Sequence, residues 1–445
     1  MKVAMRKINY LYMRKTFLVG LLSLIVSTSA FAGGYITNTN QHIAFLRMLA
    51  RGAVIDIDGV YSNPAGLGFL QDGLYFSFNS QSAFQTRNIH STFGLFPEGS
   101  RYYEGKASAP VIPSFQLAYK MGNWAFSGSF AIVGGGGKAN FDNGLPMFDS
   151  QIIAGLAANG VSSSMYSMNS SMVGKQYIFG LQLGASYKIS EYLSVFGGGR
   201  VAMVSSGYVG HMTTTANPGF EAYQPALPQI ELDCDQSGMG FTPIIGADLK
   251  FDKFNLGMKY EFKTNIDIEN KTKKNSGPGG APLAGYEDGV KTPNDIPALL
   301  TAALGYEFLP TLRATVEYHH FFDKQAGMAG GKEKSLTGGT NEYLIGAEWD
   351  ITKIITVSSG YQKTDFGLSD DFQSDVSFSC DSYSVGFGGA VKLSSKFTLN
   401  LAYFWTKYSD YTKDMLTGYN GLPLPGKDVY SRTNKVFGIG VNIKF

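Results

Sequence analysis

Several features that are missing from this sequence narrow the class of protein it encodes. After residue 32 there is no run of about 18 apolar residues, so no transmembrane helix is expected. No cysteine lies near residue 32, which argues against a lipid-anchored lipoprotein. An excess of one charge is also missing, because 37 Lys and Arg oppose 35 Asp and Glu. A nucleic-acid partner is therefore not expected.

Motifs of catalysis and of cofactor binding are absent or incomplete. Neither Gly-x-Ser-x-Gly nor His-Glu-x-x-His occurs. The four glycines at 134–137 start like a phosphate-binding loop, but Ala139 lacks the hydroxyl group that the pattern requires. Residues 233–238 open like a calcium loop, yet the twelfth position is Ile244 instead of Glu. We therefore expect no enzyme, no cofactor and no metal site.

Residues 1–32 have the organisation of a secretory signal peptide. A basic segment is followed by an apolar segment from Phe17 to Val26, and Ala30-Phe31-Ala32 has the spacing of a cleavage site. The mature chain is then expected to begin at Gly33. Because the signal peptide holds five basic residues and no acidic ones, 32 basic and 35 acidic residues remain, a net charge of −3.

The end of the chain shows what the sequence does contain. Apolar residues alternate with small or polar ones up to the C-terminal aromatic, in the order Phe437, Ile439, Val441, Ile443 and Phe445. This period of two is typical of a strand with one apolar face. The pattern recurs to give fourteen candidate strands, in a chain with 55 Gly, 26 Tyr and 32 Phe. An even number of such strands is typical of an outer-membrane β-barrel.

The connections between these strands alternate in length. Six are tight turns, and seven are long segments at roughly 82–112, 135–174, 206–240, 266–296, 323–340, 365–378 and 409–432. Short periplasmic turns and long external loops are the outer-membrane arrangement, whereas a soluble sandwich or propeller does not require this rhythm. Residues 73–445 are therefore predicted to form an all-β, fourteen-stranded antiparallel transmembrane barrel with seven long external loops. Closure is required because an open sheet edge in lipid leaves backbone groups unpaired.

Residues 33–72 do not alternate and precede the first strand. A short helix is predicted from Gln41 to Ala53, and Asn63-Pro64-Ala65-Gly66 ends any regular element. Forty residues are too few for a core of their own, while a barrel of fourteen strands is wide enough to need filling. We therefore expect this segment to fold inside the barrel as a plug, here called the hatch.

The stretch LRMLARGAVIDIDGVYSNPAGL, residues 46–67, resembles the N-terminal hatch of the FadL family of outer-membrane transporters for long-chain fatty acids and other hydrophobic compounds. The triplet Asn63, Pro64 and Ala65 matches the marker of that family. The resemblance implies a plugged barrel whose external loops capture a hydrophobic ligand and pass it to a site beside the hatch. It further implies a shift of the hatch and lateral exit through a gap in the wall, without ATP or metal. Pro243, or the glycines at 197–199, mark either such a gap or ordinary strand curvature.

The second long loop is unusually apolar and is the predicted capture surface or, alternatively, a lid over the barrel mouth. Its candidate ligand-binding residues are Phe141, Leu145, Met147, Phe148, Ile152 and Ile153. A carboxylate ligand needs a basic partner, for which the candidates are Arg47, Arg51, Arg200 and Arg313. Burial of an acyl chain contributes affinity at about 0.8 kcal/mol per CH₂.

Export leaves two possibilities for the cysteines. Cys234 and Cys380 fall in or beside predicted external loops, so they either form one disulfide between two loops or remain two free thiols. The expected partners are a fatty acid or hydrocarbon, outer-membrane lipid and lipopolysaccharide, and the barrel assembly machinery, with the protein acting as a monomer. A general diffusion porin and a surface-binding barrel are the alternative functions.

Overall fold

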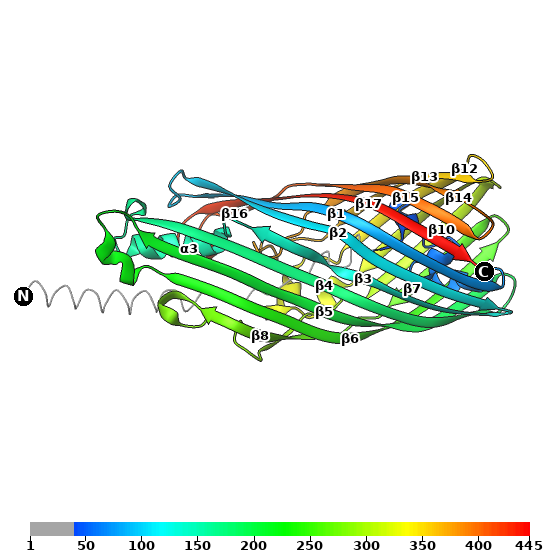
Figure 1. Ribbon diagram of the computed structural model, residues 1–445, viewed down its shortest axis with the longest axis horizontal. Helices are drawn as coiled ribbons and strands as arrows, with labels where there is room; N and C mark the ends of the chain where they lie inside the picture. The colour runs from blue at the N-terminus through cyan, green and yellow to red at the C-terminus, as the bar shows by residue number, and fades with distance from the viewer. Residues whose placement is uncertain (1–39) are drawn as a thin grey trace, which may run out of the picture.

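The computed structural model describes residues 40–445, and it has the shape of a long barrel (Figure 1). The predicted signal peptide and the first residues of the predicted hatch lie outside the described residues. The wall is a closed antiparallel barrel of fourteen strands, as predicted. Closure is made by β1 and β17, which pair without interruption from Tyr75↔Lys444 to Phe93↔Gly426.

The strands of the wall follow the chain order. They are β1 (Gly73–Phe93), β2 (Ser100–Met121), β3 (Trp124–Phe141), β4 (Tyr166–Lys188), β5 (Leu193–Ala216), β6 (Gln229–Phe251), β7 (Phe254–Glu261), β10 (Leu299–Leu309), β11 (Leu312–Phe321), β12 (Asn341–Asp350), β13 (Ile355–Asp365), β14 (Ser382–Lys392), β15 (Phe397–Tyr408) and β17 (Gly426–Lys444). Each of the fourteen predicted strands corresponds to one of these, and all six predicted tight turns connect neighbouring strands.

The remaining elements are short and lie within connections or within the hatch. Three further strands are β8 (Asp267–Ser276), which pairs with β6, β9 (Lys291–Pro293), which pairs with β8, and β16 (Tyr411–Met415), which pairs with β17. The helices are α2 (Ile43–Arg47), α3 (Pro146–Ala158) and the 3-10 helices η1 (Ile57–Val60), η2 (Pro64–Phe69), η3 (Ser163–Met165), η4 (Glu221–Ala226), η5 (Pro278–Gly280), η6 (Asp323–Gln325), η7 (Ala329–Ser335) and η8 (Tyr419–Gly421). No helix within residues 40–445 is both long and apolar enough to cross a membrane.

The strands extend further than the sequence indicated. Much of the predicted loops 82–112, 135–174 and 206–240 is strand, because β1 to β6 continue well beyond the apolar part of the wall. Beyond that part neither face meets lipid, so the alternation that predicts a strand disappears while the backbone pairing continues. α3 lies at the end of the molecule opposite the C-terminus (Figure 1).

A belt of large apolar side chains faces outward. Along β3, Trp124, Phe126 and Phe130 are exposed, whereas the intervening Ala125 and Ser127 are buried against the interior. The same alternation recurs around the wall, with exposed side chains that include Leu183, Phe241, Leu304, Ile345, Leu401 and Phe437. An apolar surface of this extent and continuity is suited to contact with lipid chains.

The described part of the hatch, residues 40–72, packs inside the half of the barrel that holds the C-terminus (Figure 1). Glycines in the wall permit this close approach: a Cβ at Gly257 would overlap the carbonyl oxygen of Gly52, and one at Gly386 would overlap that of Leu46. α2 is shorter than predicted because the chain becomes extended at Met48, where φ is −150° and ψ is 101°.

Candidate functional site

Arg47 and Arg51 of the hatch lie in a buried network of ion pairs. The Arg51 guanidinium donates to both carboxylate oxygens of Asp58, at 2.7 and 2.8 Å. Arg47 pairs with Glu348 of β12 and donates to Ser358 Oγ at 2.8 Å. Both arginines therefore have carboxylate partners, and Arg47 ties the hatch to the wall. Their predicted role in ligand binding stays a prediction.

Arg313 and Arg200, the other two predicted carboxylate partners, are also in ion pairs. Arg313 pairs with Glu348 and, at 3.0 Å, with Asp350. Arg200 lies 2.7 Å from Glu261 and stacks over the ring of Tyr61 of the hatch. A buried charge that loses its partner costs several kcal/mol, about 3–5 in measured cases, so both arginines are tied into the wall, and Arg200 also contacts the hatch through Tyr61.

The Asn63-Pro64-Ala65 triplet connects the hatch to β4 and β6. The Asn63 amide donates to the carboxylate of Asp248 in β6, while its oxygen accepts from Gly66 N at 3.2 Å and so caps η2. Ser186 Oγ of β4 donates to Pro64 O at 2.6 Å. Ala65 is fully buried. The triplet thus anchors the hatch to the wall through these hydrogen bonds. Its predicted role in gating stays a prediction.

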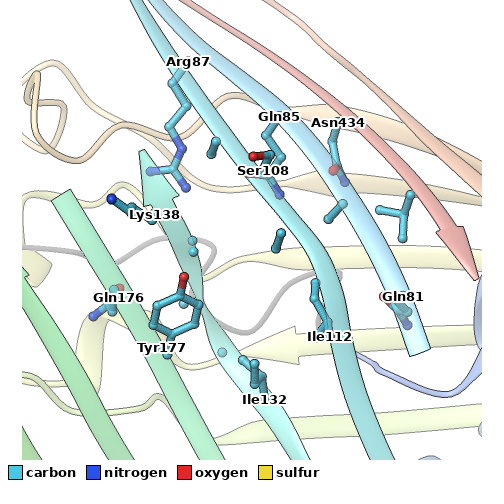
Figure 2. A pocket seen from close by; sticks show the side chains of 18 of the residues that line it. Gln81, Gln85, Arg87, Ser108, Ile112, Ile132, Lys138, Gln176, Tyr177 and Asn434 are labelled. Atoms are coloured by element: carbon cyan, nitrogen blue, oxygen red, sulfur yellow. The ribbon is translucent and has the colours of Figure 1, made fainter. Parts of the chain in front are cut away.

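A cavity of about 320 Å³ lies between the hatch and the outer end of the barrel (Figure 2). Gln41 of the hatch contributes to its lining, together with residues of β1 to β4, β15 and β17 and of the segment between β13 and β14. Figure 2 shows Gln81, Gln85 and Arg87 along β1, with Gln176 and Tyr177 of β4 across the cavity. The predicted binding residues do not line this cavity.

The wall beside this cavity is discontinuous. β2 and β3 pair at Ala107↔Ala139 and again at Phe115↔Phe130, and between these points the two strands do not pair with each other. On the other side of β3, the pairing with β4 shifts register twice between Ile132 and Gly137. Gly135 and Gly137 adopt φ of +98° and +74°, which side chains disfavour, so the glycine run allows the strand to leave the regular sheet.

The backbone pairing is regular at the positions where the sequence suggested a possible gap in the wall. Gly199 and Pro243 lie opposite each other in an uninterrupted β5–β6 pairing. Of the two possibilities for these residues, ordinary curvature is the one observed. The glycine run at 134–137 was compared only with a phosphate-binding loop, and its place within a strand was the signal that sequence reasoning missed.

The predicted capture loop folds over the barrel mouth through α3. Leu145 and Ile153 are buried in an apolar cluster with Phe141, while Ile152 is buried in a neighbouring cluster and Phe148 packs against both. A second cavity of about 30 Å³ lies among these side chains; Phe141 and Leu145 line it, and it shares Arg87, Gly136, Gly137, Gln176 and Phe378 with the larger cavity. The loop is thus a lid; capture stays a prediction.

A buried carboxylate holds α3 in place. Asp375, between β13 and β14, accepts from Met147 N at 2.6 Å and from Tyr430 Oη at 2.9 Å. Burial, with a further contribution from Asp428, raises the pKa of Asp375 to about 7. Burial likewise raises the pKa of Asp149 in α3 to about 6, although Arg101 lies 2.9 Å away. Both carboxyl groups that contact the lid therefore bind a proton more readily than exposed ones do.

The two cysteines are free thiols, so of the two possibilities the disulfide is not formed. Cys234 accepts a hydrogen bond from Thr272 Oγ1 at 3.2 Å, and Cys380 lies 3.7 Å from Tyr430 O. Both belong to the apolar cluster beneath the lid. Burial raises the pKa of Cys380 to about 11, which disfavours the thiolate that oxidation requires.

The protein is a plugged fourteen-stranded β-barrel. Its wall is closed, its N-terminal segment packs inside, and a cavity lies beside a break in the wall. Its fold is that of the FadL family. A FadL homologue from Pseudomonas aeruginosa superimposes with a TM-score of 0.67 at 13% identity, over 93% of this chain and 100% of that chain. The toluene transporter TodX of P. putida gives a TM-score of 0.53 at 15% identity over 88% and 94% of the two chains. For the toluene transporter TbuX of Ralstonia pickettii the TM-score is 0.54, with 15% identity over 94% and 99%. Neither a protein-family model nor a curated protein sequence matches the chain.

Proposed function

We propose that this protein is an outer-membrane transporter of hydrophobic compounds, with long-chain fatty acids as the foremost substrates. The route begins beneath the lid at Leu145, continues through the larger cavity, and leaves through the break between β2 and β3 into the membrane. The observation that carries the proposal is the position of this cavity, which touches the hatch at Gln41 and the unpaired residues of both strands.

The chemistry of the route suits an apolar chain. Phe141, Leu145, Met172 and Phe378 line the small cavity, and Ile112, Ile132 and Val436 are among the lining residues of the larger one. Transfer of each CH₂ of a ligand from water into such surroundings contributes about 0.8 kcal/mol. A passive route therefore needs no coupled energy source, since the membrane accepts the ligand at the other end.

Exit through the wall explains the break between β2 and β3, which an aqueous channel does not require. Backbone groups that face lipid without partners are costly, so a wall break of this kind is maintained only where protein or a ligand covers it. The cavity lies at the break, and its lining includes the exposed residue Val111. A hatch held by the Arg47–Glu348 ion pair and by the contact of Tyr61 with Arg200 then closes the direct path to the periplasm until a ligand shifts it.

The test is to obstruct the break without changing the rest of the wall. Ala109 lines the cavity at the unpaired part of β2. We expect Ala109→Trp to lower the uptake of radiolabelled oleate by at least about tenfold in cells that express the folded protein. The matched control is Ala314→Trp in β11, because Ala314 is itself paired with both neighbouring strands, at Tyr306 and Ala347. It should leave uptake unchanged.

Normal oleate uptake by the Ala109→Trp variant would reject the break as the exit. Planar-bilayer conductance separates the main alternative, because a general diffusion porin gives a large steady conductance without ligand. A large conductance of the wild-type protein would favour that porin over the proposed transporter.

A further inference from the structure

Two arginines face each other across the closing seam of the barrel. Arg87 of β1 lies directly opposite Arg432 of β17, and both line the larger cavity. Like charges directly opposite one another on neighbouring strands destabilise a sheet. Such a pair within a lumen therefore calls for a compensating negative charge.

No carboxylate supplies that charge among the described residues. Neither arginine is in an ion pair, and Arg432 instead stacks over the ring of Tyr408, 4.9 Å from its centre. The Nε atom of Arg87 is buried without a hydrogen-bond partner. Asp375 lines the adjoining small cavity, but Met147 N and Tyr430 Oη already engage its oxygens. The pair thus contrasts with Arg47, Arg51, Arg200 and Arg313, each of which has a carboxylate partner.

The guanidinium of Arg87 reaches the wall break. A Cβ at Gly136 of β3 would overlap Nη2 of Arg87, so the glycine leaves the space that this side chain occupies. The arginine pair and the break in the wall are therefore parts of one site. A ligand held by the pair has its chain beside the unpaired residues of β2 and β3.

Uncharged polar groups around the same cavity also lack partners. Gln176 of β4 is only 2% exposed, and neither its Nε2 nor its Oε1 makes a hydrogen bond. Gln85 and Asn434, on β1 and β17, each have a buried side-chain oxygen without a donor. Figure 2 shows these two beside Arg87, with Gln176 on the opposite side. A buried unsatisfied polar group is costly, so this arrangement suits a site completed by a polar ligand group.

We propose that Arg87 and Arg432 bind the acidic headgroup of an amphiphile, whose chain lies against the apolar lining toward the wall break. The inference rests on the proposed function and makes it more specific, because it selects acidic amphiphiles over uncharged hydrocarbons at this site. Guanidinium groups bind carboxylates and phosphates through paired N–H donors, so both headgroups share the required chemistry.

The experiment compares ligands that differ only in the headgroup. Binding of dodecanoate, dodecyl phosphate and dodecanol to the full-length, detergent-purified protein is measured by isothermal titration calorimetry, with inorganic phosphate alone as a fourth ligand. We expect both acidic amphiphiles to bind at least about tenfold more tightly than dodecanol. Inorganic phosphate should bind far more weakly than dodecyl phosphate, since it lacks the chain.

Two variants test whether the arginine pair causes the preference for acidic amphiphiles over dodecanol. The double substitution Arg87→Gln and Arg432→Gln should lower the affinity for both acidic amphiphiles about tenfold and leave dodecanol within about twofold. Lys407→Gln, an exposed cation on β15 outside the cavity, is the matched control and should change neither. Heat-modifiable migration on electrophoresis verifies that each variant is folded.

The outcomes separate this inference from the proposed function. Equal affinities for dodecanoate and dodecanol in the wild-type protein, or an unchanged ratio in the folded double variant, would overturn the headgroup site while leaving hydrophobic transport in place. Tight binding of inorganic phosphate alone would also overturn it, because the site would then take a free anion. Failure of the wild-type protein to bind any of the three chains would instead reject the proposed transport.

Discussion

The two halves of the barrel interior differ in whether their arginines have carboxylate partners. Around the hatch, Arg51 meets Asp58, Arg200 meets Glu261, and Asn63 meets Asp248. Around the larger cavity, Arg87 lacks an ion-pair partner, and neither side-chain polar atom of Gln176 makes a hydrogen bond. The first pattern is that of a region completed by its own chain, and the second is that of a region completed by something else. Two predictions test this difference, and a third concerns the lid over the second half.

The largest effect is expected when the same substitution is made at one arginine of each half. Arg51→Met leaves the carboxylate of Asp58 buried without its bidentate partner, which we expect to lower the free energy of unfolding by about 3–5 kcal/mol. Arg87→Met removes a charge that has no partner and should leave stability unchanged or slightly higher. Urea unfolding in lipid vesicles, followed by tryptophan fluorescence, measures both. Equal losses in the two variants would remove the distinction between the halves.

A smaller effect is expected from two asparagines. Asn63→Ala removes the cap of η2 and one of the two amides that donate to Asp248, for an expected cost of about 2–3 kcal/mol. The hatch should then become more accessible to protease added from the periplasmic side. Asn434→Ala, at the cavity, deletes an oxygen that has no donor and should cost little. Protection of the hatch that is the same in both variants would contradict this.

The smallest effect concerns the lid and pH. Because the pKa of Asp375 is raised to about 7 in the folded protein, the folded state binds more protons than the unfolded one between its ordinary pKa and 7. Lid stability should therefore fall as pH rises through this window, by about 1–2 kcal/mol from pH 5.5 to 8. Hydrogen exchange of α3 amides, corrected for intrinsic rates, measures this change.

Asp375→Asn is the matched variant for the pH prediction and should abolish most of the dependence. The other ionisable groups that interact with Asp375 are Asp428, Lys332, Lys413, Tyr419 and Tyr430. Of these, Asp428 is the one whose ionisation repels Asp375. A dependence that persists fully in Asp375→Asn would assign the effect to another group, such as Asp149.

The sequence predicted the strands well where lipid imposes alternation and less well elsewhere. Each of the fourteen strands was recognised from its apolar face, but the outer parts of β1 to β6 were predicted as loops because no apolar face is needed there. The length of the segment before the first strand correctly predicted that it packs inside the barrel. The helix in it was predicted too long, since wall contacts and not local periodicity determine where the chain extends at Met48.

The candidate site was harder to predict for a related reason. Arg47 looked available in the sequence, yet its partner Glu348 lies 301 residues further along the chain. The pairing of Arg87 with Arg432 was not predicted, because it depends on the register between the first and last strands of the barrel. Whether a polar side chain is satisfied is decided by distant segments, and a single sequence does not show these contacts.

The inward glycines have a consequence for the history and the engineering of this barrel. Gly257 and Gly386 lie where the backbone of Gly52 and Leu46 passes, so the inner surface of the wall is complementary in shape to this particular hatch. A hatch grafted from another barrel would meet recesses in the wrong places and protrusions where it needs room. Hatch and wall must therefore change together, and chimaeras between relatives should assemble only when both are exchanged as one unit.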